Sequence, residues 1–302
     1  ISGNEDLSLV AICEQNKDAD LPDHIPVYTN PDDMLSNHPD LDIVSICTPN
    51  GWHEAMSIKA LNKGFNVICE KPLALSTLSC QRIKQAKASS GKELICVMQN
   101  RYSPVSQWLK KIVSENRLGK IFMVNVSCYW NRNPAYYKSS DWRGSSKLDG
   151  GTLFTQFSHY VDSLYWLFGN MEITGATFGN YNHGTSIDFE DSGIFSFKTE
   201  GGAIGSFNYT TATYQQNFES TFTIISEKGT VKIAGQYMNT LRYSDIEGLD
   251  TPMLPEGNNI RHLGEVYRSA VSRIKRENGD ATSLEDGTEV VRIIEDVYRF
   301  KK

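Results

Sequence analysis

The chain has 302 residues, of which 39% are hydrophobic and 22% charged, and its formal net charge is -6. This length allows two domains with separate cores, and the composition is that of a soluble globular protein. The acidic balance argues against nucleic acid or an anionic membrane as the main partner. No apolar run approaches the roughly 20 residues that a membrane-spanning helix requires.

The six cysteines form no CxxC pair and have no metal-type spacing, which predicts buried free thiols and no metal site. Two N-x-S/T tripeptides begin at Asn125 and Asn208, but no secretory segment is visible. We therefore interpret both as chance matches and expect a cytoplasmic protein. The chain begins at Ile1 without methionine and reaches its first strand-like run at Leu7, so we expect that its beginning is missing.

Apolar runs alternate with helical segments through the first hundred residues. Strands are predicted over residues 7–14, 42–47, 65–70 and 93–98, and helices over 32–37, 53–63 and 75–90. This alternation predicts a doubly wound βαβ sheet of parallel strands. Ligands of such sheets bind in the crevice at the carboxyl ends of the strands.

Two of these strands end in a charge. The third predicted strand stops at Glu70-Lys71-Pro72, where a partly buried lysine could hold a substrate hydroxyl or stabilise an alkoxide. Glu14 ends the first strand, and in a dinucleotide-binding sheet it would bind the adenosine ribose and favour NAD over NADP. The GxGxxG fingerprint would then lie roughly 20 residues upstream of Glu14, before the present start of the chain. Taken alone, each charge could be an ordinary strand end.

The paired motifs SICTPN-x-x-H, ending at His53, and VICEKP, ending at Pro72, resemble the glucose–fructose oxidoreductase / inositol dehydrogenase (Gfo/Idh/MocA) family. The resemblance implies an N-terminal Rossmann domain (residues 1–100) and a C-terminal α+β domain with an open, mainly antiparallel sheet (residues 101–302). It implies NAD as the cofactor, and Lys71 as the residue that reaches the reacting sugar hydroxyl. The residues implied to contact the cofactor are Thr48, Pro49, Asn50, His53, Glu70, Lys71, Pro72 and Asn100.

Two residues at the domain junction are candidates for the substrate. Arg101 could bind a phosphate or carboxylate of the ligand, although a surface arginine is the alternative, and Tyr102 lies beside it. The following segment, 129–143, mixes aromatic and basic side chains: Tyr129, Trp130, Tyr136, Tyr137 and Trp142 with Arg132, Lys138 and Arg143. Such mixtures can bind single-stranded nucleic acid, but in an acidic chain a loop that stacks on sugar faces is the better interpretation.

The motifs DWRG, from Asp141, and LDGG, from Leu148, resemble family members that oxidise nucleotide-linked N-acetylated sugar acids, of the UDP-N-acetylglucosaminuronate 3-dehydrogenase type. This resemblance places Trp142 and Arg143 beside the cofactor.

A helix is predicted over residues 152–168, with Thr155, His159 and Asp162 sharing one face. A lone helix histidine is usually structural, but the family resemblance makes His159 the proton acceptor. Polyol-oxidising relatives carry an aspartate where this chain has Thr155. A hydroxyl supplies no negative charge there, and this difference favours a nucleotide-linked substrate that Thr155 and His159 would contact.

The remaining sequence is dominated by strand signals, with hairpin turns at 200–202 and 227–229, and ends in helices predicted over 261–278 and 283–300. One face of the resulting sheet is expected to form a homodimer or homotetramer.

The sequence thus predicts an NAD-dependent dehydrogenase of a secondary hydroxyl, at C3 of a nucleotide-linked N-acetylated sugar or sugar acid. An inositol or free-sugar dehydrogenase is one alternative, against which Thr155 weighs. A non-catalytic dinucleotide-sensing regulator is the other, and the presence of both Lys71 and His159 weighs against it. Which of the two is the formal base stays open, because their titrations can be coupled.

Overall fold

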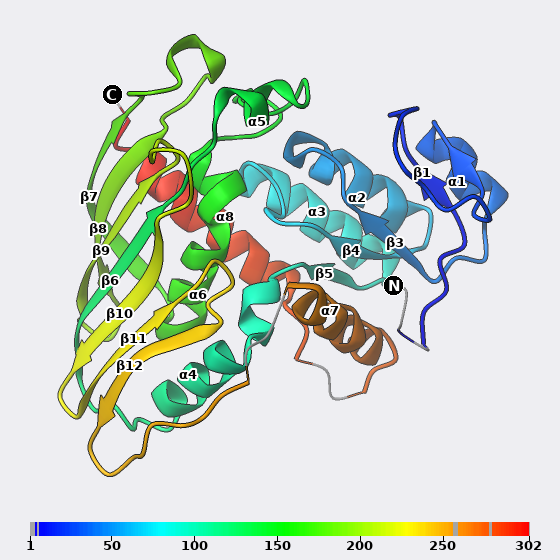
Figure 1. Ribbon diagram of the computed structural model, residues 1–302. Helices are drawn as coiled ribbons and strands as arrows, with labels where there is room; N and C mark the ends of the chain where they lie inside the picture. The colour runs from blue at the N-terminus through cyan, green and yellow to red at the C-terminus, as the bar shows by residue number, and fades with distance from the viewer. Residues whose placement is uncertain (1–3, 5, 256–258, 278–279, 302) are drawn as a thin grey trace.

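The computed structural model describes residue 4 and residues 6–255, 259–277 and 280–301. Short parallel strands with helices on both sides form one part of the molecule, and a large twisted sheet with one open face forms the other (Figure 1). Within the described ranges, no helix has the length and apolar character needed to cross a membrane.

The N-terminal part contains five parallel strands in two sheets. β1 (Ile12–Cys13) pairs with β2 (Val27–Tyr28), and β4 (Asn66–Cys69) lies between β3 (Ile43–Ile46) and β5 (Leu94–Cys96). The helices of this part are α1 (Pro31–Asn37), the 3-10 turn η1 (Asn50–Trp52), α2 (His53–Asn62) and α3 (Thr77–Ser90). The predicted βαβ arrangement is confirmed, although the first predicted strand shrinks to two residues and β2 was not predicted.

Alternating side chains on β4 face two different helical layers, as expected for a strand buried on both sides. Val67 and Cys69 belong to the main core, together with buried residues of α2 and α3. Ile68 packs instead with Val266 and Ala270 of α7 (Asn259–Ile274). α7 thus belongs by sequence to the predicted C-terminal domain but packs on the N-terminal sheet. The division into two domains at residue 100 stays a prediction.

The large sheet has the strand order β12-β11-β10-β6-β9-β8-β7. Its strands are β6 (Ile121–Tyr129), β7 (Met171–Gly179), β8 (Ser192–Thr199), β9 (Ile204–Thr210), β10 (Glu219–Ser226), β11 (Gly229–Ala234) and β12 (Thr240–Ile246). Every neighbouring pair is antiparallel except β6 with β9, so the prediction of an open, mainly antiparallel sheet is confirmed. β12 was not predicted, because its sequence, TLRYSDI, is largely polar.

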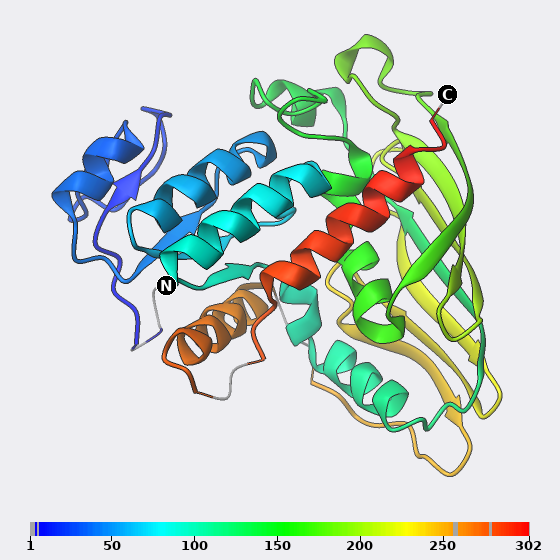
Figure 2. The same ribbon diagram turned by 180° about the vertical axis from the view of Figure 1, so that it is seen from behind.

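In the part of the chain that the structure describes, helices cover one face of this sheet and leave the other open (Figure 2). They are η2 (Gln99–Tyr102), α4 (Pro104–Ser114), the π-helix η3 (Leu153–Phe157), α6 (Ser158–Phe168) and α8 (Leu284–Tyr298); the short α5 (Pro134–Lys138) and η4 (Gly184–Ser186) lie in loops. The predicted helix over 152–168 therefore forms, but its first turn is a π-helix.

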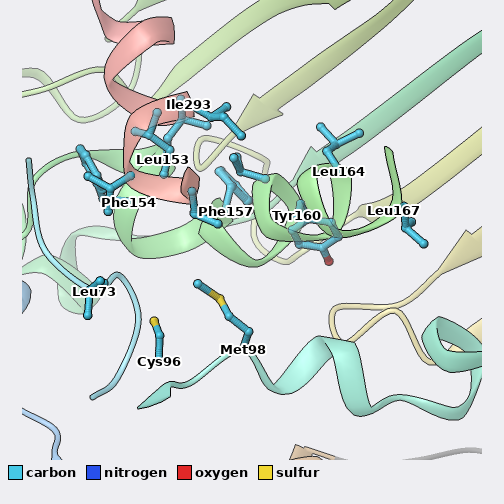
Figure 3. Close-up of a cluster of buried hydrophobic side chains, with 14 of the residues drawn as sticks. Leu73, Cys96, Met98, Leu153, Phe154, Phe157, Tyr160, Leu164, Leu167 and Ile293 are labelled. Atoms are coloured by element: carbon cyan, nitrogen blue, oxygen red, sulfur yellow. The ribbon is translucent and has the colours of Figure 1, made fainter. Parts of the chain in front are cut away.

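The main core joins the two parts of the molecule. Figure 3 shows Leu73 and Cys96 of the N-terminal part near Leu153 and Phe157 of the helix η3–α6, and Ile293 of α8 belongs to the same cluster. α8 can approach closely because it carries Gly287, where an added Cβ would lie 3.1 Å from atoms of Cys96 and Leu73. The strand ends of the first part are thereby fixed against helix η3–α6 of the second.

Candidate active site

Lys71 lies immediately beyond the carboxyl end of β4, and its Nζ donates a 2.6 Å hydrogen bond to the carbonyl oxygen of Thr155 in the π-helix. Burial lowers the pKa of Lys71 below its usual value, while the charges of Glu70 and Asp149 act in the opposite direction. The lysine is thus partly buried, as the sequence predicted, and is fixed by the helix that carries the other candidate catalytic residue.

The π-helix brings a group of polar side chains to one place. A π-helix turn closes with an i→i+5 bond and so holds more residues than an α-helical turn, and such turns are frequent at functional sites. Thr155, Gln156, His159 and Tyr160 line the same pocket as Lys71, and the pocket volume is about 240 Å³. Its other lining residues are Gln99, Trp130, Arg132, Tyr136, Gln236 and Tyr237.

His159 is 8% exposed, and neither of its ring nitrogens has a hydrogen-bond partner among the described residues. Burial, with a smaller contribution from the charge of Lys71, holds the pKa of His159 well below its usual value. The imidazole is therefore neutral near neutral pH and can accept a proton from a bound ligand. Asp162, which the sequence places on the same helix face, does not bind the ring; it binds Arg101.

From the sequence we expected no carboxylate beside Thr155. In the structure, Asp149 places one there. The Thr155 hydroxyl contacts the Asp149 carboxylate through Oδ1, and the Gly144 N–H donates to Oδ2 over 2.8 Å. Asn50 Nδ2 donates to the Thr155 hydroxyl oxygen over 2.7 Å and to the Asp149 carbonyl oxygen over 2.8 Å. Burial raises the pKa of Asp149, although the Thr155 and Gly144 hydrogen bonds and Lys71 oppose this. The expectation of a site without negative charge near Thr155 is therefore corrected.

Several residues predicted to contact the cofactor lie where parallel strands end. Glu14 follows β1 and accepts a 2.8 Å hydrogen bond from the Asn16 N–H, exposed Thr48 follows β3, and half-buried Glu70 follows β4. Asn100 is 1% exposed, and neither its amide nitrogen nor its amide oxygen has a partner among the described residues. A buried amide with a free donor and acceptor, beside these strand ends, fits the polar groups of a dinucleotide.

Other predicted cofactor residues are occupied by contacts within the protein. The Nδ1 of buried His53 lies 2.6 Å from the carbonyl oxygen of Pro72, and its Nε2 lies 2.9 Å from that of Thr48. Burial lowers the pKa of His53, which the two carbonyl contacts oppose. His53 thus connects the loops that follow β3 and β4, one of which contains Pro49.

Trp142 and Arg143 lie near the pocket without lining it. The Arg143 guanidinium carbon is 4.4 Å from the centre of the Tyr136 ring and 5.6 Å from that of Trp142. Because Tyr136 lines the pocket, this pair supports its wall.

Two predicted substrate residues are not brought to the pocket. Arg101 Nε and Nη2 donate to the Asp162 carboxylate over 2.9 and 2.6 Å, and Nη2 also reaches Asp286 over 3.3 Å. The charge of this buried guanidinium is thus compensated by carboxylates of α6 and α8. Tyr102 packs against the core between α7 and the parallel sheet. Neither residue lines the pocket, and their assignment to the substrate stays a prediction.

The structure adds pocket residues that sequence reasoning did not assign to the site. Arg132 and Tyr136 belong to the aromatic–basic segment, so that segment was the usable signal. Gln236 and Tyr237 come from the loop between β11 and β12, where the sequence contains no comparable pattern.

Comparison with known proteins places the chain in a class. Residues 2–98 match the oxidoreductase family with an NAD-binding Rossmann fold, and residues 106–232 match the GFO/IDH/MocA C-terminal domain. The chain belongs to this oxidoreductase family, and NAD, the cofactor that the sequence predicted, is the one that the family's Rossmann fold binds.

Two solved structures are similar over most of the chain. The WlbA dehydrogenase of Bordetella pertussis, in complex with NADH and UDP-GlcNAcA, is 30% identical with a TM-score of 0.83, over 91% of this chain and 82% of that one. The WlbA enzyme of Chromobacterium violaceum, with the same two ligands, is 32% identical with a TM-score of 0.81, over 91% and 79%.

A curated relative is the inositol 2-dehydrogenase 2 of Saccharopolyspora erythraea, which is 24% identical over 225 residues. The match covers 74% of this chain but only 62% of that protein, so the chain spans less than two thirds of its length.

Proposed function

We propose that the protein is an NAD-dependent dehydrogenase that oxidises a secondary hydroxyl, at C3 of a nucleotide-linked N-acetylated sugar or sugar acid. One observation carries the proposal: the ammonium of Lys71 and the unpartnered imidazole of His159 line the same pocket beside the carboxyl ends of the parallel strands. Buried polar groups are usually hydrogen-bonded, and a ligand hydroxyl in this pocket would supply the partner that the His159 ring lacks.

In the proposed reaction, neutral His159 accepts the hydroxyl proton while the Lys71 ammonium donates a hydrogen bond to the oxygen on which negative charge develops. The electron pair of the C–H bond leaves as hydride for the nicotinamide, which NAD supplies when bound, and the C–O bond becomes a carbonyl. Thr155 fixes Lys71 through its carbonyl oxygen. Both pKa values lie below their usual ranges and can be coupled, so Lys71 in its neutral form is the other candidate base.

The nucleotide-sugar assignment is supported by the two WlbA structures, which contain UDP-GlcNAcA. It is also supported by the cations in the pocket lining. The inositol alternative is supported by the similarity to inositol 2-dehydrogenases, at 24–28% identity.

We propose that the open face of the large sheet joins subunits. Ile225, Met123 and Ile204 are directly opposite one another on β10, β6 and β9, and each is exposed. Such a row of apolar side chains supports association through this face. Replacing Met123 and Ile204 by lysine should reduce the molar mass measured by light scattering to that of a monomer; an unchanged mass would place the contact elsewhere.

The substrate assignment can be tested by NAD reduction in the full-length protein with UDP-GlcNAcA, UDP-GlcNAc, myo-inositol and glucose in parallel. Turnover of the UDP sugars alone is expected. Turnover of inositol or glucose alone would be compatible with the Lys71–His159 chemistry but would refute the proposal that the substrate is a nucleotide-linked sugar. Binding of NADH without turnover of any of the four would favour a dinucleotide-sensing regulator.

A further inference from the structure

Arg132 is the second cation of the pocket lining, and it comes from the segment that follows β6. Its guanidinium carbon lies 4.9 Å from the centre of the Trp130 ring and 5.1 Å from that of Tyr136. The guanidinium is therefore held by aromatic faces at the wall of the pocket.

The hydrogen-bond acceptors of Arg132 among the described residues are all neutral. Nε donates to Gln156 Oε1 over 2.7 Å, and Nη1 donates to the carbonyl oxygen of Asn131 over 2.8 Å and to Asn217 Oδ1 over 3.3 Å. Among the described residues, no carboxylate forms an ion pair with the guanidinium. A partly buried guanidinium normally has an anionic partner, because removing its charge from water is costly.

The position of Arg132 is fixed before any ligand binds. Gln156, which accepts from Arg132, donates through Nε2 to the Tyr136 hydroxyl over 2.7 Å. Buried His183 lies with Nε2 2.5 Å from the Arg132 carbonyl oxygen and with Nδ1 3.0 Å from the Asp191 carboxylate. Both the side chain and the backbone of Arg132 are thus held in place, which reduces the entropy lost when a ligand binds.

The pocket is positive in a chain of net charge -6. Its described lining contains Lys71 and Arg132 but neither aspartate nor glutamate. Burial lowers the pKa of Arg132, and the charge of Arg132 contributes to lowering the pKa of Lys71, so the two cations are close enough to repel each other. An anion bound between them would relieve this repulsion and supply the missing partner.

We propose that Arg132 binds the carboxylate of a sugar acid, and that this contact selects acidic over neutral sugars. The proposal rests on the proposed function, because it takes the pocket to hold the reacting sugar. The nearness of Arg132 to Lys71 favours a carboxylate on the reacting ring over the diphosphate, which would lie further from the reacting carbon. A carboxylate suits this guanidinium because a hydrogen bond between two oppositely charged groups is shorter and stronger than one between neutral groups.

The test compares dissociation constants, measured by titration calorimetry on the full-length protein with NADH bound, for two matched pairs: UDP-GlcNAcA with UDP-GlcNAc, and glucuronate with glucose. The variants are Arg132→Met, which keeps the length and apolar contacts, and Arg132→Lys, which keeps the charge. Arg299→Met, which removes a surface arginine paired with Asp296, is the control. Thermal unfolding of each variant verifies that it is folded.

The wild type should bind the acid of at least one pair more tightly than its neutral partner. Arg132→Met should weaken binding of that acid roughly 10- to 100-fold, the loss of one charge-assisted hydrogen bond, with less than a threefold change for the neutral sugar. Arg132→Lys should fall between these values, and Arg299→Met should match the wild type.

Equal weakening of UDP-GlcNAcA and UDP-GlcNAc would assign Arg132 to the diphosphate and overturn the proposal. The Arg132 proposal would also be overturned if the wild type bound neither acid more tightly than its neutral partner. In that case, oxidation of either UDP sugar would show that the proposed dehydrogenase function still holds. Failure of all four ligands to bind would contradict both.

Discussion

Helix α6 carries Asp162 and His159, which lie in two different buried regions. Charged groups of the described residues have ion-pair partners in the first region and lack them in the second. Asp162 joins Arg101 and Asp286 in what we call the Arg101 joint, where η2, α6 and α8 meet and every charge has a partner. His159, three residues earlier, faces the pocket. Among the described residues its ring nitrogens have no hydrogen-bond partner, and Arg132 in the same pocket has no carboxylate partner. Both regions are largely buried, so burial alone does not distinguish them.

The difference indicates which buried polar groups serve the fold and which serve a ligand. In the joint, the carboxylates compensate the cost of burying Arg101. In the pocket the compensation is incomplete, so a ligand that supplies the missing contacts gains binding energy. Substitutions in the two regions should therefore affect different observables.

The largest expected effect is on turnover. Replacing His159 by Gln, or Lys71 by Met, should lower kcat roughly 10²- to 10⁴-fold, because a proton acceptor or the stabilisation of the developing alkoxide is lost. The stability of His159→Gln should stay near that of the wild type, since neither ring nitrogen of His159 has a partner to lose. Steady-state kinetics and thermal unfolding measure the two quantities. His24→Gln, at an exposed position, is the control; near-normal turnover in both pocket variants would refute the catalytic assignment.

Substitutions in the Arg101 joint should lower the stability of the protein. Asp162→Asn leaves the buried Arg101 without its bidentate partner and should lower the free energy of unfolding by about 3–5 kcal/mol. Urea unfolding measures the loss, with Glu265→Gln, which breaks the surface pair with Arg268, as a control expected to cost less than about 1 kcal/mol. A stable Asp162→Asn protein with the kinetic defect of His159→Gln would show that the two regions do not differ as described.

The pH dependence of kcat/KM links the pocket to Asp149. The active form is expected to need neutral His159 and protonated Lys71, so activity should fall at acid pH with a midpoint below the usual histidine value and at alkaline pH with a midpoint below the usual lysine value. The Asp149 charge raises the pKa of Lys71. Asp149→Asn should therefore move the alkaline limb to lower pH, by about one unit, and leave the acid limb in place. A shift to higher pH would contradict this arrangement.

The smallest effect is expected at Thr155. Thr155→Val removes the hydroxyl contacts with Asp149 and Asn50 but keeps the carbonyl oxygen that accepts from Lys71. Turnover should fall about tenfold or less, and Thr155→Ser should restore it. A loss as large as that of Lys71→Met would mean that the hydroxyl takes a direct part in the chemistry.

The sequence predicted what depends on local pattern. The carboxyl end of β4 just before Lys71 follows from an apolar run that stops at charge and proline. The π-helix was not predicted, because the spacing of apolar residues over 152–168 fits a continuous α-helix.

The sequence pattern does not predict side-chain contacts between residues that lie far apart along the chain. Arg101 was assigned to the ligand because its partners Asp162 and Asp286 lie 61 and 185 residues away along the chain. Asp149 lies only six residues before Thr155, but its contact with the Thr155 hydroxyl depends on the fold of the loop between them, which the sequence pattern does not specify.

The most direct test of the account follows the hydride itself. UDP-GlcNAcA carrying deuterium at C3 is mixed with NAD and the full-length protein for a single turnover, and the reduced nicotinamide is analysed by mass spectrometry. The account predicts that the wild type transfers the deuterium to the nicotinamide, whereas Lys71→Met and His159→Gln transfer it at least 10²-fold more slowly. Reduced nicotinamide without deuterium, or transfer at the wild-type rate by both variants, would contradict it.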